Sequence, residues 1–122
     1  MVNLDYRDAR PIYTQICDGI REQIRSGILQ QGERLPSVRE LATELTINPN
    51  TIQRAYRELE IQGWIASVPG KGSFVCGVPK STLSEEAKLL AEFDAVAQKL
   101  LAMGVTPEEL ADRITQGGKN HA

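Results

Sequence analysis

The chain has 122 residues, of which 41% are hydrophobic and 25% are charged, and its formal net charge is -2. This size and composition are typical of one globular domain with a small appendage, and they exclude a disordered or fibrous protein. A negative net charge argues against a strong, indiscriminate binder of nucleic acid.

The first predicted helix begins at Pro11, where the missing proline N–H costs nothing, and ends at Gly27. Apolar residues recur every four positions along it and mark one buried face. These residues are Ile12, Ile16, Ile20 and Ile24, with Ile28 and Leu29 beyond. A turn over residues 30–34 follows.

Two short helices come next, and their starts are marked by capping residues. Ser37 and Glu40 form a capping box that begins the first of them. Asn48 as N-cap and Pro49 at the first helical position begin the second, which ends near Gly63. Because only a brief turn joins them, we expect a helix-turn-helix. The predicted core positions are Val38, Leu41, Ala42, Leu45, Ile52, Ala55, Tyr56 and Leu59.

A β-hairpin is predicted after these helices. Residues 64–68 and 73–75 alternate as strands do, and residues 69–72 supply a turn rich in glycine. A helix, a helix-turn-helix and a hairpin together make a winged helix. We assign residues 1–77 to this predicted DNA-binding domain.

The composition changes in residues 78–122. Residues 82–103 are predicted as one long helix that ends at Gly104, Thr106 begins a short final helix, and residues 117–122 are expected to be a loose tail. So short a segment cannot bury a core of its own. Its apolar stripe either packs back on the winged helix or, as we favour, pairs with a second subunit. The predicted dimerisation residues are Leu83, Leu90, Phe93, Ala97, Leu100 and Met103.

The fold class expected is therefore mainly α with a small β-hairpin: a winged helix-turn-helix followed by a short C-terminal helical dimerisation segment. Basic residues fall in or beside the predicted DNA-binding parts, whereas many acidic residues lie near the C-terminus. The basic residues are Arg34, Arg39, Arg54, Arg57 and Lys71.

The polar side of the third predicted helix carries amide, hydroxyl and guanidinium groups. Asn and Gln can pair with adenine in the major groove, and Thr can hydrogen-bond a base or a phosphate or touch a thymine methyl group. Arg54 and Arg57 lie further along, where phosphate contact is favoured. A merely solvated helix face is the alternative for each residue taken singly.

Arg39 and Lys71 extend this surface. Arg39 lies in the first turn of the second helix, where it either contacts DNA or forms a surface ion pair with Glu40, Glu44 or an acidic residue elsewhere. Helix capping alone, without a DNA contact, also explains the serine at position 37. A tight turn alone explains Gly70 and Gly72, but it does not explain Lys71 between them. The candidate DNA-binding residues are Ser37, Arg39, Asn48, Asn50, Thr51, Gln53, Arg54, Arg57, Gly70, Lys71 and Gly72.

No metal or redox centre is expected. Cys17 and Cys76 lack the close spacing of a metal or redox pair, so two reduced thiols are favoured over a redox switch. The single histidine, His121, leaves zinc and haem without a ligand set. No apolar run approaches the roughly 18 to 20 residues of a membrane span, and no signal peptide begins the chain. We therefore expect a cytoplasmic protein without membrane contact.

The motifs in residues 35–42, 50–56, 63–65 and 70–75 resemble those of the GntR family of bacterial transcription regulators, and the short helical C-terminal segment resembles the YtrA subfamily. The resemblance implies a homodimer that represses a transporter-type operon by binding double-stranded operator DNA. It also implies DNA contacts at Arg39, at residues 48–53 and at the wing glycines. Pro49 and Gln53 stand where some relatives have arginine, which bears on the operator sequence.

Other branches of that family add a larger effector-binding or aminotransferase-like domain, for which this chain is too short. We therefore expect no cofactor, and no sequence motif indicates a particular small-molecule effector. The leading hypothesis is a sequence-specific repressor. A winged-helix module for protein–protein interaction is the alternative, and a small hydrolase fails because no nucleophile is paired with a base.

Overall fold

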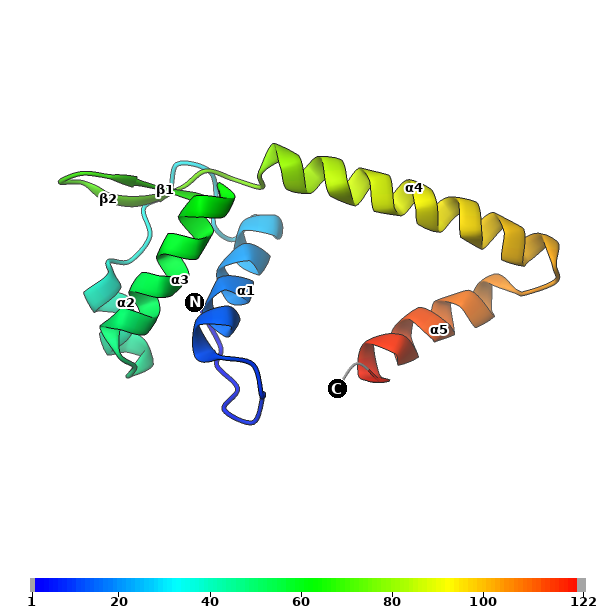
Figure 1. Ribbon diagram of the computed structural model, residues 1–122, viewed down its shortest axis with the longest axis horizontal. Coiled ribbons are helices and arrows are strands. Elements are labelled where there is room, and N and C mark those ends of the chain that lie inside the picture. The colour runs from blue at the N-terminus through cyan, green and yellow to red at the C-terminus, as the bar shows by residue number, and fades with distance from the viewer. Residues whose placement is uncertain (1, 121–122) are drawn as a thin grey trace. The chain divides into compact units, whose positions relative to one another are not determined.

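The computed structural model describes residues 2–120, with side chains to residue 117, and divides into two compact units, Met1–Lys80 and Ser81–Ala122. His121, excluded above as a metal ligand, lies outside the described residues. The first unit holds α1, α2, α3 and the hairpin β1–β2, and the second is formed mainly by α4 and α5 (Figure 1).

Helix α1 spans Ile12–Arg25, directly after Pro11. Ile16, Ile20 and Ile24 are buried, as the four-residue spacing predicts. The expectation that this stripe continues to Ile28 is wrong, since Ile28 is 67% exposed. The helix has already ended, and Gly27 turns the chain with a φ of +84°.

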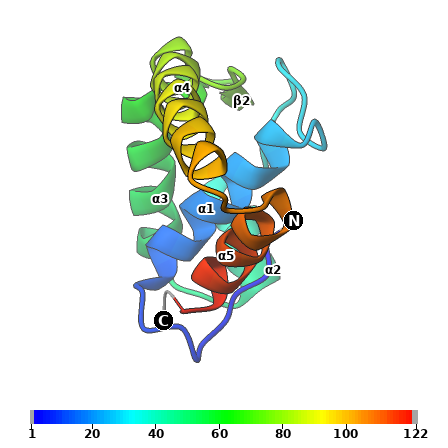
Figure 2. The same ribbon diagram turned by 90° about the vertical axis from the view of Figure 1, so that its right-hand side faces the viewer.

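Helices α2 (Val38–Leu45) and α3 (Pro49–Gln62) form the predicted helix-turn-helix. Helix α3 packs against both α1 and α2, and α1 and α3 lie side by side in both views (Figures 1 and 2). It therefore forms the centre of the core, which closes around four of its residues: Ile52, Ala55, Tyr56 and Leu59.

Strands β1 (Ile65–Val68) and β2 (Gly72–Val75) pair antiparallel and form the wing. The segment before α2 pairs with β2. The Leu35 N–H donates to the Ser73 carbonyl at 2.8 Å, and Arg34 forms an isolated antiparallel β-bridge with Phe74. This segment was predicted as a turn only. Strand β2 is thus paired on both edges, with β1 and with the segment before α2.

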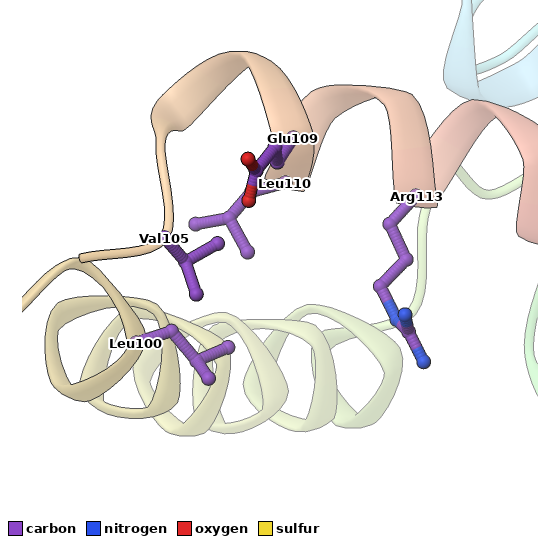
Figure 3. A pocket seen from close by; sticks show the side chains of 5 residues that line it. All are labelled: Leu100, Val105, Glu109, Leu110 and Arg113. Atoms are coloured by element: carbon purple, nitrogen blue, oxygen red, sulfur yellow. The ribbon is translucent and has the colours of Figure 1, made fainter. Parts of the chain in front are cut away.

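The second unit consists mainly of α4 (Lys80–Ala102) and α5 (Pro107–Asn120). The Thr106 hydroxyl accepts the Glu109 N–H at 3.1 Å, as the capping signature predicts. Leu100, Val105 and Leu110 face one hollow of about 460 Å³ where the two helices meet (Figure 3). Of the residues described, none belongs to a helix long and apolar enough to cross a bilayer.

The predicted loose tail is wrong for residues 117–120, which continue α5 as helix. Glycine lowers helix stability by about 1 kcal/mol per residue relative to alanine but does not remove the backbone hydrogen bond. A helix begun by a side-chain cap can therefore run through such positions.

Candidate DNA-binding surface

The outer side of α3 is polar and accessible. Asn50, Gln53, Arg54 and Arg57 are exposed, and Thr51 is half-buried. The apolar side of the same helix lies in the core, with Ile52 and Leu59 fully buried. A rigid, packed helix thus presents amide, hydroxyl and guanidinium groups outward, as a helix that enters a major groove must.

Asn48 begins α3, and its side chain has a structural role. Its Oδ1 accepts the Asn50 N–H at 2.8 Å, which satisfies one of the free donors of the first turn. Pro49 follows at the first helical position. The Oδ1 atom of Asn48 therefore serves the helix cap.

The start of α2 is fixed by a capping box. The Ser37 hydroxyl accepts the Glu40 N–H at 3.0 Å, and the Ser37 N–H donates to the Glu40 carboxylate at 3.3 Å. The Ser37 N–H is therefore occupied in the free protein. Arg39 is exposed in the same turn, so the box sets the direction from which its guanidinium group leaves the helix.

Tyr56 joins α3 to the chain just before α2. Its hydroxyl donates to the Pro36 carbonyl at 2.7 Å, and burial raises the pKa of the phenol, with smaller contributions from the charges of Glu40 and Glu44. The protonated donor is therefore favoured in the folded protein. This bond ties the residue before the N-cap of α2 to α3, and the sequence pattern identified Tyr56 only as a core residue.

The tip of the wing carries Lys71, which is exposed between two glycines with positive φ, Gly70 at +75° and Gly72 at +117°. A Cβ atom on Gly72 would stand 2.9 Å from Nε of Arg34. The absence of a side chain at Gly72 therefore lets the Arg34 guanidinium lie close to the hairpin backbone. Arg34, an exposed cation, joins Lys71 on the wing, although it was not among the predicted contact residues.

A second contact that the sequence pattern did not predict joins α1 to α3. Cζ of Arg54 lies 3.8 Å from the ring centroid of Tyr13. Beside this pair is an open hollow of about 480 Å³. Its lining comes from the start of α1 and the first turns of α3: Pro11, Ile12, Tyr13, Asn50, Thr51 and Arg54.

The two cysteines differ in environment. Cys17 is buried, its thiol lies 3.5 Å from the Ala55 carbonyl, and burial raises its pKa to about 11. Cys76 is exposed. Over the part of the chain that is described, histidine, cysteine and acidic side chains form no group of three that could hold a metal ion.

Comparison with known proteins places this architecture in a family. Residues 12–75 match the family described as bacterial regulatory proteins, gntR family. The HTH-type transcriptional repressor YtrA of Bacillus subtilis is 45% identical over 85 residues, a match that covers 70% of this chain and 65% of that protein. The chain thus spans just under two thirds of the length of this relative.

Solved structures of similar fold support the same family. YtrA from Sulfolobus acidocaldarius, a GntR-family transcription factor, is 30% identical, covers 98% of each chain and has a TM-score of 0.58. The DNA-binding domain of AraR, solved in complex with operator ORE1, is 29% identical, covers 62% of this chain and 93% of that one, and has a TM-score of 0.54. The chain therefore belongs to the GntR family, with YtrA-type relatives, and is a DNA-binding transcription regulator and not an enzyme.

Proposed function

We propose that the protein is a homodimeric, cytoplasmic repressor that occupies a two-fold-related operator and so blocks transcription of a transporter-type operon. The observation that carries this proposal is the polar outer side of α3, which is exposed on a helix whose opposite side is locked in the core. In this proposal Asn50, Thr51 and Gln53 contact base edges, and Arg54 and Arg57 contact phosphates.

Contacts at both ends of α3 complete the proposed interface. Arg39 reaches a phosphate or a guanine from the start of α2, and Lys71 approaches the sugar-phosphate backbone from the tip of the wing. Ser37, Asn48, Gly70 and Gly72 shape these approaches through caps and turns more than through their own side chains. Their substitution is expected to alter DNA binding by moving the neighbouring cations.

A second copy of the chain is the proposed partner of α4. No residue of this helix is buried, and Phe93 and Leu90 are 48% and 62% exposed. Leu89, Leu90 and Phe93 line a shallow apolar hollow with Glu86. Pairing two such helices removes apolar surface from water, and two DNA-binding units then read two half-sites. Leu83, Ala97, Leu100 and Met103 extend this proposed dimer surface.

A protein–protein interaction module is the alternative function. Surfaces that bind proteins concentrate their binding energy in aromatic and apolar anchors that fill pockets on the partner. The outer side of α3 offers amides and guanidinium groups instead, which favours DNA. The repressor role and the transporter-type target rest on the resemblance to YtrA-type regulators, and the genes that neighbour this one would test the target.

The proposal is tested by titrating the protein against its own promoter fragment and against the same fragment scrambled, both at physiological salt. We expect preference for the native fragment, and Arg39→Ala should weaken that binding by roughly 1–3 kcal/mol. Lys71→Ala should mainly reduce the salt dependence of binding. Equal affinity of the wild-type protein for both fragments would contradict the proposed function.

A further inference from the structure

The contact between Tyr13 and Arg54 connects the proposed recognition helix to α1. Cζ of Arg54 lies 3.8 Å from the centroid of the Tyr13 ring, a distance at which a guanidinium group stacks on the face of the ring. Tyr13 is half-buried and packs against the core, whereas Arg54 is exposed. The guanidinium group of Arg54 is therefore stacked, at the protein surface, on an aromatic ring that the core holds in place.

Stacking uses the face of the guanidinium plane and leaves its N–H groups at the edge for hydrogen bonds. In the described part of the chain the ion pairs involve other arginines, Arg10 and Arg21, and their partners Asp8 and Asp18. The charge of Arg54 is therefore not neutralised by a carboxylate there. An arginine with its position fixed and its donors free is suited to an anion supplied from outside.

The hollow beside the stack indicates where that anion lies. It is lined by Asn50 and Thr51 of α3 in addition to Arg54, and by residues 11–13 at the start of α1. A duplex whose major groove holds α3 places its sugar-phosphate backbone along the flank of the helix. The group that fits this position is a backbone phosphate.

We propose that Tyr13 is a positioning residue for DNA binding: its ring holds the Arg54 guanidinium so that the N–H edge faces a phosphate of the bound duplex. The inference rests on the proposed function, since it assigns a role within the same interface. An unrestrained arginine side chain loses rotamer freedom when it binds a phosphate, and the stack removes part of that loss before DNA arrives.

The test uses the full chain and a fluorescent duplex that the wild-type protein has selected from a random-sequence library. Tyr13→Leu should weaken binding about two- to fivefold, the range of an exposed cation–π contact, while Tyr13→Phe should bind as the wild type does. Arg54→Ala should weaken binding at least as much. Tyr13→Leu in the Arg54→Ala background should then cause no further loss.

A packing role for Tyr13 predicts a different result. In that case Tyr13→Leu lowers the melting temperature and the affinity together, and the slope of affinity against salt concentration stays unchanged. Our proposal predicts a shallower slope for Tyr13→Leu, because a phosphate contact is weakened, and a similarly shallow slope for Arg54→Ala. Arg25→Ala is the matched control, since it removes an arginine that stacks over Trp64 at the other end of α1.

The outcomes that would overturn the inference are distinguishable from those that would overturn the proposed function. If Arg54→Ala weakens binding but Tyr13→Leu does not, or if the two losses add in the double variant, Tyr13 does not position Arg54 and the proposed function stands. If neither Arg39→Ala nor Arg54→Ala changes binding, α2 and α3 do not form the DNA surface. The proposed function then fails, and the role of Tyr13 fails with it.

Discussion

Tyr56 shows how one hydrogen bond places the residues of the proposed interface. Its hydroxyl donates to the Pro36 carbonyl, next to the capping box that begins α2. Tyr56→Phe removes the donor and leaves the carbonyl without this partner. We expect the free energy of unfolding to fall by about 1 kcal/mol, measured by urea denaturation. Operator affinity should also fall, but by less than in Arg39→Ala, because the guanidinium group remains.

The same variant has a pH signature. The unfolded chain ionises Tyr56 near its ordinary pKa of 10.0, whereas the folded chain holds the proton to higher pH because burial raises the pKa. The stability that Tyr56 contributes is therefore complete below pH 10 and is lost as the pH rises above it. The difference in the free energy of unfolding between wild type and Tyr56→Phe should therefore narrow as the pH rises above 10. Tyr6→Phe is the control, because Tyr6 is 71% exposed. It should change neither the free energy of unfolding nor the operator affinity.

At the scale of the element, the wing depends on a glycine and an arginine from different segments. Gly72 has a φ of +117°, and a Cβ atom there would meet the Arg34 guanidinium. Gly72→Ala should cost about 1–3 kcal/mol of stability through backbone strain. It should also weaken operator binding, because the flexible end of Arg34 is pushed away from the wing.

Gly70→Ala separates these two effects. Gly70 also has a positive φ, but nothing lies within 4 Å of where its Cβ atom would be. This variant should lose stability and leave Arg34 in place, so any loss of operator binding that it shows comes from a shift of the neighbouring Lys71 and not of Arg34. The binding defect of Gly72→Ala should shrink in the Arg34→Ala background, whereas a defect of unchanged size there would exclude Arg34 as its cause.

The elements themselves were predicted well because their signals are local. Ser37 with Glu40, Asn48 with Pro49, and Gly63 mark helix ends that the structure confirms. The contacts between elements were not predicted, since the pairs Tyr13–Arg54 and Arg34–Gly72 join residues far apart in the chain. Neither hydrophobic period nor capping chemistry carries information about such pairs, which depend on how the packed helices and the wing meet.

At the scale of the whole molecule, α4 is the element whose apolar side chains most need a partner. Phe93 and Leu90 project from one side of the helix at 100° per residue, and Ala91 lies on the other side. Phe93→Glu places a charge in the proposed dimer surface, whereas Ala91→Glu adds the same charge away from it. We expect Phe93→Glu to be monomeric and Ala91→Glu to be dimeric in light scattering coupled to size exclusion.

The change in assembly should appear in DNA binding as well. A dimer holds its second DNA-binding unit at high effective concentration beside the second half-site, so that losing the dimer weakens operator binding by about tenfold or more although α3 is untouched. A single half-site should be bound equally by the wild type and Phe93→Glu, because one unit suffices for it. A dimeric Phe93→Glu protein with unchanged operator affinity would show that this side of α4 does not join the subunits.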